Sequence, residues 1–480
     1  MSARPLTPGL VALDIAKIIH SDSVPSDAVI HKIIINTPDA NISPTELISI
    51  EISRDYCNNI SDFTLVTFSI MLGDYVKLIH PHMDNLEMTI ITTEYSTNTH
   101  VRYKMVILKG IEGLTGSMYS SYTRDELNKI DKVIVEAQCV DRLVETIRTQ
   151  PVDGVYSYTT IDKVIKTIFN SAISNIKVDG VKKDPSVKID GMPEKYNIDI
   201  IEPNNSKTYR HISIPMGVRL LDMPSFLQET DYGVYSSGIG TYIQRYSHKH
   251  DRKTAKSTIF VYPIYHPGLW DTPGKKLMIL SAPTNIMSVI ENSYIVDGDV
   301  IKIIGNGNVT SKEESQNLIK DVGNAIITTK TDSVILNSVA TKDKAVHTAK
   351  KDNLKADRLT KMRDGTTNVN YTKPTSNPYV QYSKVASNML SRYTIKWMHS
   401  NHTILYPGMP VSYIYEDADH GVVKLNGILH SNFTKYNTSD RTHVTILNVL
   451  LEPYINNIKK GIDTVDVRRS ITPTYRGGGL

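Results

Sequence analysis

The chain has 480 residues and a mass of 53.8 kDa, which is enough for two to four domains that each bury a core. Its 54 basic and 50 acidic residues leave a net charge of only +4, without the basic excess typical of nucleic-acid-binding domains. Two cysteines, Cys57 and Cys139, exclude a disulfide framework, and no stretch approaches the roughly 18 apolar residues of a membrane span. We therefore expect a protein that is made and folded in the cytoplasm.

Strand patterns dominate the first third of the chain. Residues 1–40 form an N-terminal segment, with a short helix predicted over Leu10–Ile19 and a strand over Ile30–Asn36. Turns then recur every eight to twelve residues, which indicates an antiparallel barrel or sandwich over residues 41–150. The strands expected there are Leu47–Ser53, Phe63–Leu72, Val76–His80, Glu87–Tyr95, Val101–Leu108 and Lys132–Val140.

Residues 151–284 are predicted to form a helical segment and a middle α+β domain. Thr160 is expected to cap an amphipathic helix, whose apolar residues recur at helical spacing directly after it. A polar connection over residues 176–200 follows the helix. Two further strands are expected over Thr258–Ile264 and Lys276–Leu280.

Residues 285–455 are predicted to form a second barrel with a basic insertion at 340–380, followed by an extended tail over 456–480. The strands expected at its start are Tyr294–Val296, Val300–Ile304 and Ala325–Thr329. Within the insertion, Lys342–Arg363 could be a solvated helix or a flexible segment. Acidic residues interrupt this run, which favours a solvated face over phosphate binding.

The most regular β pattern lies between Met409 and Leu451. Met409–Glu416 alternates as a strand with unlike faces, and the polar turn Asp417–Gly421 leads into a return strand over Val422–His430. Gly427 in that strand predicts a bulge or a close approach of two backbones. His443–Leu451 is apolar on both faces, so both faces are expected to be covered.

Residues 403–437, TILYPGMPVSYIYEDADHGVVKLNGILHSNFTKYN, resemble the last barrel of the central baseplate hub proteins of contractile-tailed, myovirus-like bacteriophages. In that family a strand, a Pro-Gly corner, a tyrosine-rich strand, a polar hairpin and a GVVKL-type strand occur in this order. Residues 41–150 resemble the family's first barrel more weakly. The resemblance implies a mainly β fold with two barrels per chain.

The same resemblance implies a structural role in the virion, in the tail baseplate, after assembly in the host cytoplasm. Three chains would form a homotrimeric ring that adapts the six-fold tail tube to the three-fold central spike. The implied partners are the tail tube protein, the central spike protein and the wedge proteins of the baseplate. DNA would pass through the central channel without specific binding, and no membrane insertion is expected.

No catalytic, cofactor-binding or metal-binding residues are assigned from the sequence, and no enzymatic activity or cofactor is expected. His248, His250 and His266 with Asp251 could be imagined as metal ligands, but SHKHDRK reads as a solvated charged loop. The glycine pairs lack the context of a dinucleotide site. One alternative is a tail-tip hydrolase or carbohydrate-binding module, which a carboxylate-lined cleft would favour. A third possible function is that of a capsid or connector protein.

Overall fold

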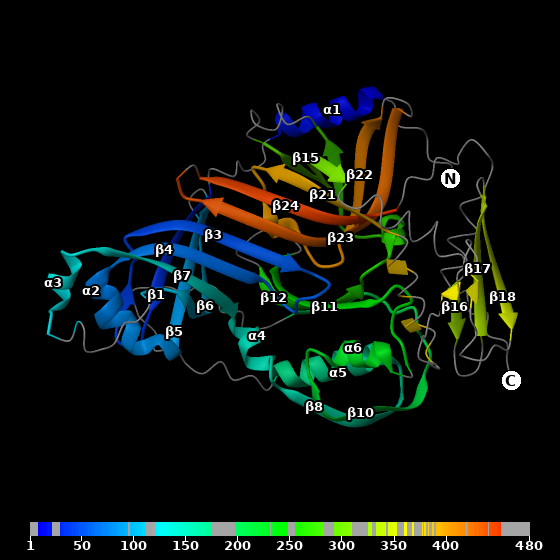
Figure 1. The fold of residues 1–480 in the computed structure, drawn as a ribbon, viewed down its shortest axis with the longest axis horizontal. Helices are drawn as coiled ribbons and strands as arrows, with labels where there is room; N and C mark the ends of the chain where they lie inside the picture. Colours follow the sequence, from blue (N-terminus) through cyan, green and yellow to red (C-terminus); the bar gives the residue numbers. More distant parts are fainter. Residues whose placement is uncertain are drawn as a thin grey trace.

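The chain is mainly β in the computed structural model, with a few helices packed against its sheets (Figure 1). None of the helices in the described part of the chain is long and apolar enough to span a membrane. The residues that the structure describes are 8–21, 29–94, 97–111, 119, 121–174, 197–230, 232–247, 255–282, 292–309, 325–328, 333–341, 344–352, 360–361, 367–368, 377, 379–380, 383, 386–387, 390–417, 421–439 and 441–452.

The first β unit is one half of a large sheet, and all its neighbouring strands are antiparallel. Its strands in spatial order are β2 (Asn41–Ile42), β1 (Val29–Asn36), β5 (Leu86–Glu94), β6 (Thr97–Lys109), β7 (Lys132–Asp141), β4 (Phe63–Met71) and β3 (Glu46–Asp55). Alternate residues such as Val66, Phe68 and Ile70 are fully buried in its core. The strand expected within residues 1–40 is therefore part of this unit, as β1.

The prediction of a strand over Val76–His80 is wrong, because this segment is helical. It comprises α2 (Leu72–Asp74), η2 (Tyr75–Ile79) and η3 (His80–Asn85). Tyr75 and Ile79, four residues apart and both buried, lie on one helical face, which the sequence reading missed.

A short neighbouring helix, α3 (Arg124–Asn128), holds this helical segment in place. A Cβ on Gly73 would lie 2.1 Å from the Arg124 carbonyl oxygen, so only glycine permits such close packing of α2 on α3. The Asp74 carboxylate accepts hydrogen bonds from Arg124 Nε at 2.5 Å and Asn128 Nδ2 at 3.2 Å.

The second β unit is a closed barrel of six strands. In order around the barrel they are β23 (Gly421–Asn437), β22 (Pro410–Asp417), β13 (Lys276–Ser281), β15 (Val300–Val309), β21 (Ser391–Met398) and β24 (Thr442–Leu451), which pairs again with β23. β14 (Tyr294–Asp297) adds to β15. Large side chains fill the interior, among them fully buried Trp397.

The strand predicted over Lys276–Leu280 exists as β13, but it pairs in parallel with β15 and β22 of the barrel rather than with the middle domain. The expected return strand over Val422–His430 is longer, because β23 continues to Asn437. The Gly427 prediction is confirmed as a close approach, since a Cβ there would lie 1.9 Å from the Leu450 carbonyl oxygen.

Both faces of β22 are covered. Val411 and Tyr413 face the barrel interior, whereas Ile414 packs outside against Ile18 of α1 (Pro8–Ile19). Figure 1 shows α1, in dark blue, lying across the barrel near β22 and β15. The helix predicted over Leu10–Ile19 is therefore confirmed, and it closes the outer side of the barrel.

Two predictions inside the second barrel region are wrong. The strand expected over Ala325–Thr329 does not join the barrel, because β16 (Ala325–Thr328) pairs with β17 (Ser333–Thr341) in a separate three-stranded sheet. The basic run was expected to be helical or flexible, but part of it is β18 (Lys344–Asp352), which pairs with β17. A two-stranded sheet of β19 (Thr360–Lys361) and β20 (Thr367–Asn368) follows. The tail over 456–480 lies outside the described residues.

The middle region places helices between two small sheets. Their core is shared between α4 (Arg142–Ile147), α5 (Ile161–Ser174), α6 (Met223–Glu229) and the strands on either side (Figure 1). The strands are β8 (Pro151–Thr159) with β10 (Tyr209–Arg219), and β9 (Asn197–Ile200) with β12 (Lys256–Pro263) and β11 (Ile239–Tyr246). Thr160 precedes α5 as predicted, but its hydroxyl is buried without a hydrogen-bond partner among the described residues, so it does not cap the helix.

Candidate functional site

One strand, β23, connects the two β units and organises the junction between them. Its first part, Gly421–Ile428, pairs with β22 inside the barrel. Its last part, Ser431–Asn437, pairs with β3 of the first unit, and β24 runs along its other edge. The two units therefore share a continuous hydrogen-bonded sheet.

A β-bulge marks the point where β23 passes from one unit to the other. Leu429 pairs with Val449 and Ser431 pairs with Asn448, so His430 is the additional residue between them. A bulge of this kind re-aims the side chain that it carries. The His430 carbonyl oxygen accepts a hydrogen bond from the Tyr56 amide at 3.1 Å, which ties the bulge to the end of β3.

The chain turns directly after β3, and Asp55 fixes this turn. Its Oδ1 accepts hydrogen bonds from the amides of Cys57 and Asn58, both at 3.0 Å, and Asn58 Nδ2 donates to Oδ2 at 2.8 Å. Burial alone would raise the pKa of Asp55, but these hydrogen bonds lower it below its usual value. The carboxylate is thus kept ionised and correctly oriented.

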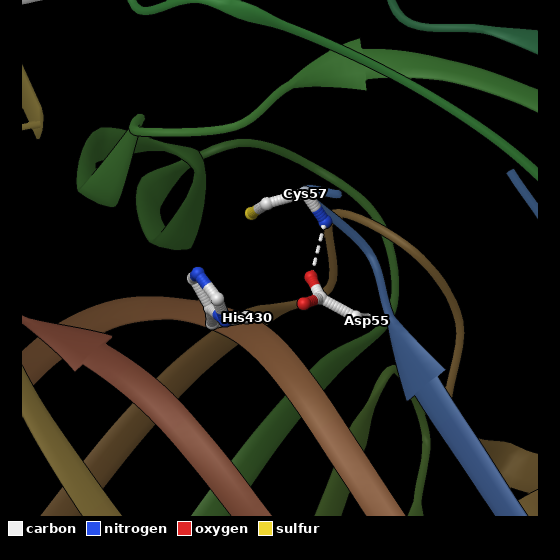
Figure 2. Close-up of side chains that lie close together, drawn as sticks. All are labelled: Asp55, Cys57 and His430. Atoms are coloured by element: carbon white, nitrogen blue, oxygen red, sulfur yellow. Dashed lines mark hydrogen bonds between the residues drawn. The ribbon is translucent and has the colours of Figure 1, made fainter. Parts of the chain in front are cut away.

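Asp55, Cys57 and His430 converge at this junction (Figure 2). One potential ligand atom from each side chain lies within 4.8 Å of the other two. Burial raises the pKa of the Cys57 thiol to about 12, and burial together with the nearby Arg392 lowers the pKa of His430. At neutral pH the cluster therefore consists of a carboxylate, a thiol and a neutral imidazole.

A buried hydrogen-bond network lies next to this cluster. Asn432 Nδ2 donates to the Tyr56 hydroxyl at 2.9 Å, and that hydroxyl donates to Gln244 Oε1 at 3.2 Å. Gln244 Nε2 in turn donates to the Leu405 carbonyl oxygen at 2.6 Å, and the Tyr262 hydroxyl donates to the Tyr56 carbonyl. The network therefore joins the first unit, the middle region and the barrel through side chains that water does not reach.

Arg54 adds a buried charge to the junction. It is 4% exposed, its Nη2 lies 3.0 Å from Asp62 Oδ2, and its Nη1 donates to the His402 carbonyl oxygen at 3.0 Å. Burial is the largest single effect and opposes the charge of the guanidinium, but Asp62 together with Tyr56 and Tyr242 outweighs it, so the pKa of Arg54 is raised. Tyr242 donates to the other oxygen of Asp62 at 3.1 Å, so both carboxylate oxygens are engaged.

A cavity of about 120 Å³ lies beside Arg54. Rings from both units line it, including His31, which lies 4.7 Å from the Tyr436 ring and 5.3 Å from the His443 ring between centroids. Asp62 is the one carboxylate among the lining residues that the structure describes, and it is paired with Arg54. The paired carboxylates of the hydrolase alternative are thus not found in this cavity.

Of the histidines considered in the sequence, only His266 lies in the part of the chain that the structure describes. His248, His250 and Asp251 lie outside the described residues. His266 precedes the short helix η5 (Pro267–Asp271), and burial lowers its pKa. The Asp55, Cys57 and His430 cluster was missed because its members are distant in sequence. Only the register of β3 on β23, with Asp55 opposite Ser431, could have revealed it.

No family model and no curated protein matches this chain. Several solved structures are similar to it. A tail protein from Neisseria meningitidis MC58 is 9% identical with a TM-score of 0.41, over 89% of this chain and 97% of that chain. The 43 kDa tail protein of prophage MuSo2 from Shewanella oneidensis is 8% identical with a TM-score of 0.44, over 88% and 99%. A type VI secretion component from E. coli is 10% identical with a TM-score of 0.39, over 88% and 77%.

Proposed function

We propose that this chain is a structural protein of a phage tail and serves as the central hub of the baseplate. In this role three copies form a ring that joins the six-fold tail tube to the three-fold spike. The resemblance of residues 403–437 to the last hub barrel first suggested this function. The presence of two β units in one chain, one of seven strands and one a closed barrel of six, is the observation that carries the proposal.

The two units give a physical route across a symmetry mismatch. Three chains with two β units each provide six β units in a closed ring, which suits a six-fold partner on one side. The single middle region of each chain provides three contacts on the other side. A ring of this kind requires that the two units keep a fixed angle within each chain. The shared strand β23 and the buried network around Tyr56 supply that rigidity.

Two separate exposed apolar surfaces fit contacts with two different partners. The outer face of β6 and β7 carries Val106, Leu108 and Ile134, which are 43%, 52% and 60% exposed. The sheet of β8 and β10 carries Tyr158 and Met216, which are 72% and 90% exposed. We assign the first surface to the contact that the first unit makes with the tail tube, and the second surface to the spike.

The oligomeric state is tested by light scattering on the purified chain across a range of concentration and salt, with negative-stain images of the main peak. The proposal predicts a mass of three times 53.8 kDa and a ring with six lobes around a central hole. A chain that stays monomeric under every condition, including in a mixture with its spike protein, would contradict it.

The assignment of the surfaces is tested by co-purification with the tail tube protein of the same phage. Ile134→Lys is expected to abolish this contact, whereas Met216→Lys is the matched control and is expected to retain it. Both side chains are largely exposed, so neither change is expected to alter folding. Equal binding of the tube protein by both variants would contradict the assignment.

A further inference from the structure

We propose that Asp55, Cys57 and His430 form a site for a Zn²⁺-type transition-metal ion that links the two β units. Asp55 and Cys57 belong to the first unit, at the end of β3, and His430 belongs to β23, where the strand leaves the barrel. An ion held by all three would therefore connect two segments that are far apart in the sequence. This inference does not depend on the proposed role in a phage tail.

The geometry at this point is that of a ligand set. The three side chains point toward one another in Figure 2, with potential ligand atoms within 4.8 Å. Each of them is positioned by the local backbone. Asp55 caps the turn, the Cys57 amide donates a hydrogen bond to Asp55 Oδ1 at 3.0 Å, and His430 lies in the bulge. A site organised in this way loses little conformational freedom when it binds an ion.

A second observation also points to a ligand. His430 is 8% exposed, and its Nδ1 is buried without a hydrogen-bond partner among the described residues. A buried polar atom of this kind costs free energy unless it is satisfied, and unsatisfied groups in folded proteins require an explanation. A metal ion at Nδ1 would provide the missing partner.

The types of ligand select the class of ion. A thiolate, an imidazole and a carboxylate together suit Zn²⁺ or Co²⁺, whereas Mg²⁺ and Ca²⁺ prefer sites made only of oxygen ligands. Because the cluster supplies three ligands, a water molecule would complete a tetrahedral site. The ion replaces the proton of the Cys57 thiol, and this proton is released to solvent on binding.

The charge of Arg392 favours the Cys57 thiolate, but it opposes binding of a cation through His430. The Arg392 Nη2 atom lies 3.4 Å from His430 Nε2. When Nδ1 binds the ion, the ring hydrogen resides on Nε2, which then faces a second donor and a positive charge. Replacing Arg392 with glutamine removes the charge and provides a carbonyl oxygen that Nε2–H can donate to. The Arg392→Gln variant is therefore expected to bind the ion more tightly than the wild type.

The site is tested by titrating the purified full chain with Co²⁺ and recording its absorption spectrum. A thiolate-to-cobalt charge-transfer band requires a cysteine ligand, and the chain has only two cysteines. We expect the band in the wild type, its loss in Cys57→Ser, and its retention in Cys139→Ser. The Cys139 thiol is buried in the core of the first unit, where its Sγ lies 3.4 Å from Met88 Sδ. His430→Gln is expected to weaken binding at least about tenfold, because even outer-shell changes commonly cost that much.

A measurement on the wild type guards against variants that fail to fold. Zn²⁺ is expected to slow the alkylation of Cys57 by iodoacetamide, as followed by peptide mass spectrometry, and to displace bound Co²⁺. The proposal is overturned if the wild type gives no charge-transfer band. It is also overturned if the band depends on Cys139 rather than Cys57, or if Zn²⁺ leaves the alkylation rate of Cys57 unchanged.

Discussion

Asn432 on β23 donates a hydrogen bond of 2.9 Å to the hydroxyl of Tyr56, so a side chain of the shared strand holds the turn that follows β3. Tyr56 is 1% exposed, and its hydroxyl in turn donates a hydrogen bond to Gln244 of the middle region. Removal of this one hydroxyl therefore affects three parts of the chain at once.

Tyr56→Phe is expected to lower the free energy of unfolding by about 1–3 kcal/mol, because buried polar groups lose their partner. A urea titration followed by circular dichroism measures this change. Tyr158→Phe, at a tyrosine that is 72% exposed, is the matched control and is expected to stay within about 0.5 kcal/mol of the wild type. Equal stabilities for the two variants would show that the network does not stabilise the junction.

Gly427→Ala is expected to destabilise the barrel by at least about 1–3 kcal/mol, the usual range for overpacking. The new Cβ would collide with the backbone of β24, which cannot move without breaking its ladder with β21. Gly298→Asn is the control, because that glycine has open space around it and asparagine tolerates its φ of +61°. Thermal unfolding compares the two variants, and an unchanged midpoint for Gly427→Ala would contradict the close approach.

Arg54→Met is expected to cost about 2–4 kcal/mol of unfolding free energy. This cost is lower than that of breaking a fully buried ion pair, because the Asp62 side chain is 24% exposed and water can solvate its charge. Arg219→Met removes an exposed pair with Asp222, at 63% and 48% exposure, and is expected to cost less than about 1 kcal/mol. Denaturant titrations at one pH measure the loss of unfolding free energy in each variant. Similar losses would contradict the expectation that the buried ion pair contributes more than the exposed one.

His266 is expected to make the fold sensitive to mild acid. Burial lowers its pKa in the folded protein below the ordinary value of 6.5, so below that pH the unfolded chain takes up the proton more readily. The stability that neutral His266 contributes is therefore fully present above about pH 6.5, and it is lost as the pH decreases toward the folded-state pKa. His266→Gln is expected to reduce the drop in melting temperature between pH 7.5 and pH 5.5. His20→Gln, at an exposed position, is expected to leave that drop unchanged.

Local patterns in the sequence predicted the strands well where the alternation is strong and the turns are polar, as in β22 and β23. The segment after β4 failed because Val76–His80 also has apolar residues at strand spacing, while the four-residue spacing of Tyr75 and Ile79 determines its structure. Local pattern alone could not separate these two periods. The close packing of α2 on α3, which Gly73 permits, favours the helical conformation at the start of this segment.

Local patterns could not predict where β13 pairs in the sheet, nor that Asp55, Cys57 and His430 meet at the junction. The hydrophobic run of β13 is visible in the sequence, but its two parallel partners, β15 and β22, are set by the closure of the barrel. Asp55 and His430 meet only because a bulge adds one residue to β23. Long-range register of this kind is a property of the whole sheet, and a single sequence does not contain a local signal for it.

The passage of β23 from the barrel into the first unit also has a mechanical consequence. A force that draws the two units apart along this strand loads its ladder with β3 in shear, because the ladder hydrogen bonds lie across the strand direction. Seven residue pairs, from Ser431 opposite Asp55 to Asn437 opposite Ser49, then resist together instead of opening one after another. The joint would therefore be strong against pulling along the strand and weak against peeling from its end.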